Sequence, residues 1–317
     1  MMNKRFWVES LSKEEKKSYI SFSLRLDSRI LIPNTSTMPT LVTPEWLHAQ
    51  RNHPDLVILD ASLKENISGL KPPYEGVQIP GARYFDLEKH FSDHSSGLPH
   101  TLPSEKDFEA AAQALGINQD SLIVVYDYIG IYTSPRAWWM FHIMGHTKVH
   151  VLNGGLPAWV EAGFPTEEIQ SHAFASGNFR AKLDAEKVKN LAFVQANLSK
   201  KEALVIDARS AGRFTAEVPE PRQGLRGGHI PGSYNIPFMQ VLEKGKYKSA
   251  EELKSIFSPY LNQEKPLVFS CGSGVTACVL YLALEQITDG PKAVFDGSWT
   301  EWALNPNVPV ETGQNLI

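Results

Sequence analysis

The chain repeats itself, and this repetition limits its possible fold more than any other feature. The segment ALVIDARS at 203–210 resembles LVILDASL at 56–63, and GGHIPGSYNIPF at 227–238 resembles GVQIPGARYFDL at 76–87. A strand pattern common to many proteins does not explain the shared Ile-Pro-Gly. These matches indicate an internal duplication.

Two further matches follow in the same order along the chain. PLVFSCGSGVTA at 266–277 resembles LIVVYDYIGIYT at 122–133, and FDGSWTEW at 295–302 resembles LNGGLPAW at 152–159. Paired positions in the four matches are 143–151 residues apart. Such near-constant spacing predicts two copies of one domain.

Each half alternates short apolar runs with helical stretches. The runs at 56–60 and 122–126 are continuous and rich in β-branched residues, which is typical of strands buried on both faces of a parallel sheet. Segments 105–115 and 134–145 are predicted helices, and Pro135 suits the first turn of the second one. We therefore predict an α/β fold of two tandem domains, each a mostly parallel sheet flanked by helices.

The repeat also predicts the domain boundaries. We place the first domain at 39–168 and the second at 186–317, joined by a polar linker at 169–185. Residues 1–38 have no counterpart in the repeat and mix arginines with acidic residues, which organelle transit peptides avoid. We interpret them as a disordered extension, or as the result of a misplaced start with the true one at Met38.

Composition narrows the function. The 317-residue chain has a net charge of −4 and no long basic run, which argues against nucleic acid or membrane as a partner. Its two cysteines make neither a disulfide framework nor a four-ligand zinc site, so we expect no metal and no organic cofactor. A free thiol suits a reducing compartment, and we expect the cytoplasm, or the mitochondrion if residues 1–37 are a transit segment.

The candidate chemistry lies where a predicted strand ends at Ser270 and a loop, Cys271 to Thr276, leads into a helix. Gly272 and Gly274 allow the loop to curl so that its N–H groups point inward. These amides and the positive end of the helix stabilise an anion at the loop centre. The Cys271 thiol is therefore expected to be nucleophilic, and the same loop suits an anionic persulfide.

Two residues of the helix that follows, Ala277 and Cys278, bear on this interpretation. Cys278 is predicted to be a buried packing residue, since free cysteine behaves as a small hydrophobe. Cysteine-dependent phosphatases share the strand, loop and helix, but they require an arginine six positions after the cysteine. This chain has Ala277 there, which argues against a phosphatase.

CGSGVTA resembles the active loop of 3-mercaptopyruvate sulfurtransferases, within the tandem-domain rhodanese family. SPRAWWMF, DARSAGRF, PEPR, GHIPGS and DGSW resemble further motifs of that family, and the resemblance covers the chain from about residue 40. It implies two rhodanese domains with catalysis confined to the second. The chain agrees, because the first half has Asp127 where the second has Cys271.

The loop bears on the sulfur donor. Thiosulfate is a dianion, and thiosulfate-specific relatives carry basic residues after the cysteine, where this chain has the neutral Gly272 and Ser273. We therefore expect 3-mercaptopyruvate as the donor, with thiosulfate as the alternative. The resemblance implies that Arg213 and Arg222 bind the donor, because a guanidinium matches a carboxylate.

The resemblance also implies the remaining roles. The loop residues Gly272, Gly274, Val275 and Thr276 are expected to contact the donor. His100 and Glu88 are expected to relay a proton to Ser273. The expected acceptor is a thiol, a thioredoxin-like protein or cyanide. A non-catalytic rhodanese-like binding module remains an alternative.

Nearby residues are predicted to be structural. Arg213 and Arg222 have a plainer interpretation as surface charges or salt-bridge partners. Arg209 and Arg226 are expected to be structural, and so is His229 at the turn of GHIPGS.

Overall fold

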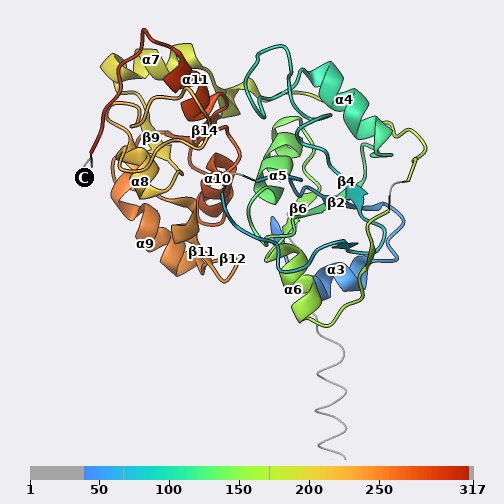
Figure 1. Ribbon diagram of the computed structural model, residues 1–317. Coiled ribbons are helices and arrows are strands. Elements are labelled where there is room, and N and C mark those ends of the chain that lie inside the picture. The colour runs from blue at the N-terminus through green and yellow to red at the C-terminus, as the bar shows by residue number, and fades with distance from the viewer. Residues whose placement is uncertain (1–38, 67, 171, 314–317) are drawn as a thin grey trace, which may run out of the picture. The chain divides into compact units, whose positions relative to one another are not determined.

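The computed structural model describes residues 39–66, 68–170 and 172–313, and it contains two five-stranded sheets that are parallel throughout (Figure 1). Across the first sheet the order is β1 (Leu41–Val42), β6 (Val149–Leu152), β5 (Leu122–Tyr126), β2 (Leu56–Asp60) and β4 (Arg83–Tyr84). Across the second it is β8 (Val188–Lys189), β14 (Lys292–Phe295), β13 (Leu267–Ser270), β9 (Leu204–Asp207) and β10 (Tyr234–Asn235). The prediction for residues 1–38 lies outside the described residues.

Both sheets have their strands in the same order relative to the chain, which confirms the duplication. When only the strands of each five-stranded sheet are counted in chain order, the fourth lies at the centre, paired with the second and the fifth. These central strands, β5 and β13, are buried along their whole length, as expected from their continuous apolar runs. The carboxyl ends of such strands form the usual ligand-binding edge of an open α/β sheet.

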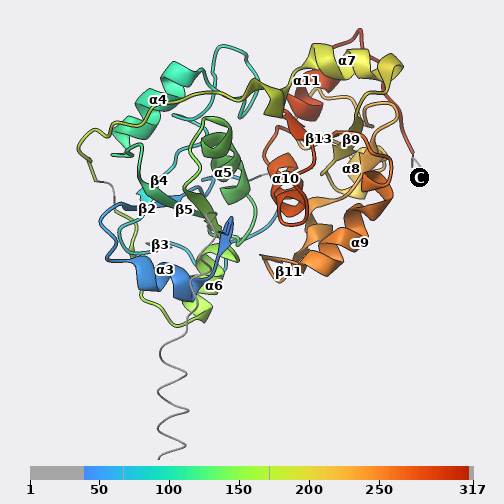
Figure 2. The same cartoon turned by 180° about the vertical axis from the view of Figure 1, so that it is seen from behind.

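Helices cover both sheets (Figures 1 and 2). Those of the first half are α3 (Pro44–Gln50), α4 (Glu105–Ala114), α5 (Ser134–Ile143) and α6 (Gly155–Glu161). Those of the second are α7 (Leu191–Lys200), α8 (Ala211–Phe214), α9 (Ala250–Leu261), α10 (Ala277–Glu285) and α11 (Ser298–Leu304), with 3₁₀ turns η1 (Ala185–Lys187) and η2 (Phe238–Val241). Short antiparallel pairs join β3 (Val77–Gln78) to β7 (Glu167–Glu168) and β11 (Leu242–Glu243) to β12 (Lys246–Tyr247). None of the helices described is long and apolar enough to cross a membrane.

Matching helix caps extend the repeat into segments whose sequences differ. The Ser104 side chain accepts a hydrogen bond from the N–H of Asp107 at the start of α4. Ser249 does the same at the start of α9, where Glu252 completes a capping box. Ser104 therefore corresponds to Ser249 in the repeat. Residues that lie at equal distances before Ser104 and before Ser249 correspond to each other as well.

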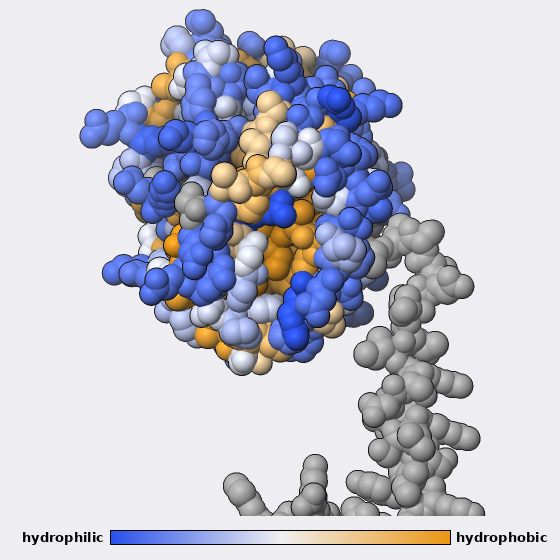
Figure 3. All heavy atoms as spheres, turned by 90° about the vertical axis from the view of Figure 1, so that its right-hand side faces the viewer, coloured by the Kyte–Doolittle hydropathy of each residue, from blue (hydrophilic) through white to orange (hydrophobic). Residues whose placement is uncertain are grey.

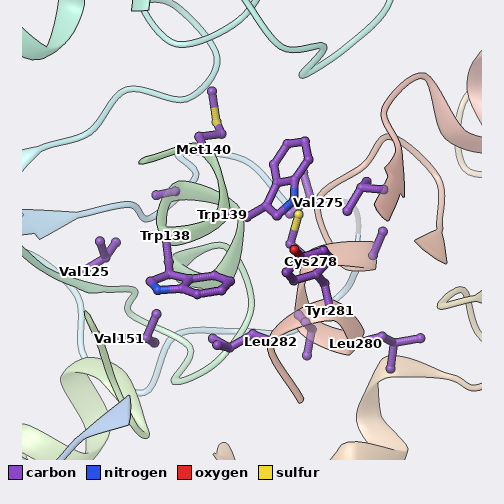
Figure 4. Packing of buried hydrophobic residues seen from close by; sticks show 14 of the residues in the cluster. Val125, Trp138, Trp139, Met140, Val151, Val275, Cys278, Leu280, Tyr281 and Leu282 are labelled. Carbon is purple, nitrogen blue, oxygen red and sulfur yellow. The ribbon is translucent and has the colours of Figure 1, made fainter. Parts of the chain in front are cut away.

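Helices α5 and α10 pack against each other and join the two halves through one hydrophobic core (Figures 1 and 4). Trp138 of α5 lies 6.1 Å from Tyr281 of α10, measured between ring centroids. Trp139 and Cys278 are fully buried in the same core, which confirms Cys278 as a packing residue.

Hydrophobic residues also gather in the middle of the outer face of the first half, bordered by hydrophilic ones (Figure 3).

The connecting segment 169–185 is attached to the first half. Phe179 is fully buried, with its ring 5.8 Å from those of Phe108 and Phe141. The Gly177 N–H donates to the carbonyl of Gln113 at 2.9 Å. The Phe179 ring and the backbone hydrogen bonds therefore hold the segment against the first half.

Candidate active site

Cys271 directly follows β13, the central strand of the second sheet, and is only 2% exposed. The first turn of α11 holds its backbone in place. The Cys271 N–H donates to Ser298 Oγ at 3.1 Å, and the Cys271 carbonyl accepts from the N–H of Trp299 at 2.9 Å. Thr300 donates to the Gly272 carbonyl through its N–H at 3.0 Å and its hydroxyl at 2.6 Å. The DGSW motif therefore positions the cysteine loop.

The first half has the same carbonyl contact, from the N–H of Leu156 to Asp127 at 3.0 Å, but the hydroxyl contact of Ser298 is specific to the second half. The φ of Ser298 is 50°, in the left-handed region, and its repeat counterpart Gly155 has a φ of 54°. Glycine adopts this conformation freely, whereas other residues do so at a cost. Ser298 keeps the strained backbone and uses its hydroxyl to hold Cys271.

The corresponding loop of the first half binds an anion of its own, the carboxylate of Asp127. Five backbone N–H groups donate to that carboxylate, at 2.9–3.0 Å: Ile129 and Gly130 to Oδ1, and Tyr132, Thr133 and Ser134 to Oδ2. The Ser134 hydroxyl adds a sixth bond at 2.7 Å. A strand, this loop and the following helix thus form an anion-binding cradle.

The second half has a counterpart of this loop with Cys271 at the position of Asp127. Within the described part of the chain, the amides of Ser273, Gly274 and Thr276 have no hydrogen-bond acceptor. They correspond to Ile129, Gly130 and Tyr132 of the first half. The loop therefore offers donors to an anion attached to Cys271.

Cys271 opens into a cavity of about 470 Å³ that both halves line. The first half contributes three apolar residues, Leu63, Leu70 and Pro99, together with Glu65, Ser68, Glu88, His100 and Tyr132. The second contributes the cysteine loop with Arg209, Arg213, Arg222 and Met239. Burial raises the pKa of the Tyr132 phenol, which therefore stays protonated at neutral pH.

Glu220 forms ion pairs with two of the three arginines that line the cavity. It accepts from Arg213 at 2.6 Å and 3.2 Å and from Arg209 at 2.8 Å. Arg209 also forms a close pair with Asp207, at 2.6 Å, and is fully buried, which confirms its structural role. Arg213 lines the cavity with its charge already compensated.

Arg222 has no carboxylate partner among residues 39–66, 68–170 and 172–313, and its guanidinium donates to Ser273 Oγ at 3.4 Å. Burial and the nearby Arg213 lower its pKa, although a guanidinium stays charged at neutral pH. A Cβ atom placed on Gly272 would lie 3.1 Å from Nη2 of Arg213 and 3.6 Å from Nη1 of Arg222. Both cations therefore lie directly beside the loop.

His100 reaches the same hydroxyl from the first half. Its Nδ1 lies 3.0 Å from Ser273 Oγ, and its Nε2 lies 3.8 Å from a carboxylate oxygen of the half-exposed Glu88. If Arg222 donates to the hydroxyl, the hydroxyl donates to Nδ1, which requires the tautomer with its proton on Nε2. The structure brings together all three residues predicted for the relay.

Burial, with Arg222 and Arg136 nearby, lowers the pKa of His100 to about 4. We expect the ring to titrate near pH 4 in an NMR titration, instead of near 6.5. As the pH falls from about 6.5 to 4 the unfolded chain takes up this proton and the folded one does not, so stability should decrease. His100→Gln should lose less stability over this range, and titration near 6.5 would contradict the assignment.

The remaining predicted loop residues divide into two groups. Val275 and Thr276 line the cavity, whereas Gly274 is not among the lining residues. The Gly274 carbonyl instead accepts from the thiol of Cys278 at 3.3 Å. Its φ of 78° requires glycine, because a Cβ atom would lie 2.8 Å from the Asp296 carbonyl oxygen.

Two further residues are structural, as predicted. Arg226 donates to four backbone carbonyls, those of Trp302, Ala303, Asn305 and Val308, at 2.6–3.2 Å. His229 is fully buried with Nδ1 2.8 Å from the carbonyl oxygen of Phe214. Sequence reasoning missed Glu220 and Tyr132, although the PEPR motif contains the first of these.

Known proteins share this architecture. The family model for the rhodanese-like domain matches this chain twice, at residues 43–162 and 190–305. Thiosulfate/3-mercaptopyruvate sulfurtransferase 1 of Arabidopsis thaliana is 40% identical over 88% of this chain and 80% of its own length. The 3-mercaptopyruvate sulfurtransferase of Escherichia coli (strain K12) is 39% identical over 85% of this chain and 97% of its own. The crystal structure of SseA from Escherichia coli superposes with a TM-score of 0.73 at 38% identity, covering 83% of this chain and 99% of that one.

Proposed function

The chain belongs to the rhodanese family and is a sulfurtransferase, and from that premise we propose that it takes sulfur from 3-mercaptopyruvate and carries it as a persulfide on Cys271. One observation supports this proposal above all. Cys271 occupies the position at which the loop of the other half binds a carboxylate through five N–H groups. A persulfide on Cys271 would place its anionic outer sulfur in the same kind of cradle.

In the first step the Cys271 thiolate attacks the sulfur of the donor. A new S–S bond forms, the bond between that sulfur and C3 of mercaptopyruvate breaks, and the bonding pair stays on C3. The proton of the donor's thiol ends on C3 and yields pyruvate. In the second step an acceptor thiolate attacks the outer sulfur, and Cys271 leaves as a thiolate. Double-displacement kinetics follow from the covalent intermediate.

Ser273 and His100 are suited to carry that proton. The ring of His100 is neutral at neutral pH, and its Nδ1 faces the Ser273 hydroxyl, so it can take up a proton and return it. Glu88 lies near the opposite ring nitrogen and favours the imidazolium while it exists. Because the donor's thiol supplies the proton, the step needs none from solvent.

The charges of the cavity favour a donor with a single negative charge. Glu220 compensates Arg213, which leaves Arg222 as the cation available to the carboxylate of mercaptopyruvate. Thiosulfate would place a second charge in the same space, where the described lining residues offer no second unpaired cation. It is therefore the weaker candidate donor.

Arg222→Ala is expected to lower kcat/KM for 3-mercaptopyruvate by about 10- to 150-fold, since a hydrogen bond to a charged group contributes about 1.5–3 kcal/mol. Arg213→Ala should have a smaller effect, because Glu220 already compensates its charge. Arg226→Ala is the matched control, since that side chain binds backbone carbonyls instead of lining the cavity. It should lower stability and leave kcat/KM nearly unchanged. A larger loss of kcat/KM in Arg226→Ala than in Arg222→Ala would contradict this assignment.

The donor is tested by comparing kcat/KM for 3-mercaptopyruvate and thiosulfate with one thiol acceptor. We expect mercaptopyruvate to be preferred. Ser273→Ala should reduce the preference, because sulfite leaves thiosulfate without needing a proton on carbon. A preference for thiosulfate in the unmodified protein would overturn the proposed donor.

A further inference from the structure

An arginine from the non-catalytic half reaches into the catalytic one. Arg136 lies on α5 and its side chain is fully buried. Its Nη2 donates to Oδ1 of Asp296 at 2.6 Å and to the carbonyl of His100 at 2.7 Å. Its Nη1 lies 3.5 Å from the carbonyl of Gly274 in the cysteine loop. One guanidinium thus contacts the loop and the segment that bears His100.

Asp296 holds the same segment at a second point. It directly follows β14, and its Oδ2 accepts from the N–H of Leu102 at 2.7 Å. Arg136 binds the carbonyl of His100, and Asp296 binds the amide two residues later. The ion pair therefore holds both ends of a short first-half segment, 100–102, that contacts the second half.

The His100 backbone needs such support. Its φ is 62°, in the left-handed region that only glycine adopts at no cost. The matching helix caps make Gly245 its repeat counterpart, with a φ of 74°. A strained residue whose side chain reaches a functional hydroxyl is typical of an active site.

The repeat counterparts of Asp296 and Arg136 are uncharged and lie on the other side of the contact between the halves. There Asn153 accepts from the N–H of Tyr247 at 3.0 Å, just as Asp296 accepts from that of Leu102. The repeat places Leu280 at the position of Arg136. Both halves thus have a side-chain oxygen that binds a backbone N–H across the interface, at Asp296 and at Asn153. Of these two places, the one beside Cys271 has the ion pair.

We propose that Arg136 and Asp296 are positioning residues that hold the His100 segment so that its imidazole reaches Ser273. This inference rests on the proposed proton relay, which acts only while the donor loads sulfur onto Cys271. The ion pair should therefore control the loading half-reaction and not the discharge of the persulfide to an acceptor. A pair that merely stabilised the fold would affect neither half-reaction selectively.

The test measures the two half-reactions separately in Asp296→Asn. An amide offers one acceptor oxygen where the carboxylate offers two, so the Arg136 and Leu102 contacts compete. We expect pyruvate release in a single turnover to slow by roughly 10- to 100-fold, as for a displaced catalytic group. Discharge of preformed persulfide to a thiol should change by less than about 3-fold, and Asp296→Glu should recover part of the loading rate.

Asn153→Ala is the matched control. It removes the corresponding contact on the far side of the interface and should leave both half-reactions unchanged. If Asp296→Asn does not fold, Arg136→Lys replaces it, since an ammonium cannot bind both oxygen partners as the planar guanidinium does. Equal slowing of both half-reactions, or of neither, overturns the proposal.

A double-mutant cycle separates positioning from a direct role. In a His100→Ala background, Asp296→Asn should cause no further loss of loading rate, because the imidazole that Asp296 positions is already absent. Additive losses overturn the proposal. The proposed function fails separately, if the unmodified protein releases no pyruvate from 3-mercaptopyruvate. If the unmodified protein does release pyruvate, and Asp296→Asn releases it at the same rate, only the positioning role fails.

Discussion

Cys271→Ser is expected to lower sulfur transfer from 3-mercaptopyruvate by roughly 10³-fold or more, as removal of a nucleophile does in other enzymes. A serine hydroxyl is not ionised at neutral pH and cannot carry sulfane sulfur. Its side chain nevertheless fits the same buried position, so the fold should be unaffected. Steady-state pyruvate release and circular dichroism measure the two effects.

Cys278→Ser is the matched control for this substitution. Cys278 is the other cysteine, is fully buried, and donates to the Gly274 carbonyl, a bond that a serine hydroxyl can also make. Turnover should stay within about 3-fold of the unmodified protein, since the side chain does not line the cavity. Loss of turnover in Cys278→Ser alone would reverse the roles assigned to the two cysteines.

The second large effect is on stability. Asp127→Ala should lower the free energy of unfolding by about 3–5 kcal/mol, because each buried amide left without an acceptor costs about 1–3 kcal/mol and water offsets part of the loss. The side chain is 1% exposed and accepts six hydrogen bonds in the loop. Urea denaturation measures the change.

Asp127→Asn gives the comparison, since it keeps one oxygen acceptor and removes the negative charge. It should lie between the unmodified protein and Asp127→Ala. A loss below about 1 kcal/mol for Asp127→Ala would mean that the loop does not depend on a bound anion. The Asp127 loop would then give no reason to expect that the Cys271 loop binds an anion.

The sheets and the cysteine loop could be predicted because their signals are local. Continuous apolar runs mark buried parallel strands, and β13 ends at Ser270 as predicted. Helix α10 begins at Ala277, just after the two-glycine loop. The duplication then extended these predictions from one half to the other.

Contacts between the halves could not be predicted in this way. No spacing rule connects His100 with Ser273, 173 positions later, and only the family resemblance suggested that pair. Arg136 lies in the family-like motif SPRAWWMF, where it was assigned no role, and its partner Asp296 lies 160 positions away. Both contacts depend on how α5 packs against α10.

Charge compensation was also hidden from the sequence. Arg213 and Arg222 had equal standing as ligands of the donor carboxylate. Only the structure shows that Glu220 binds Arg213 and Arg209 together, whereas Arg222 has no carboxylate partner among the described residues. Two arginines of similar sequence context therefore receive different expected effects.

The central claim is that Cys271 itself carries the sulfur. Intact-protein mass spectrometry after treatment with 3-mercaptopyruvate, without an acceptor, tests it most directly. We predict the mass of one added sulfur atom, located by peptide mapping to the segment with Cys271, and lost when a thiol acceptor is added. The same addition in Cys271→Ser, or its location on the segment with Cys278 alone, would contradict the claim.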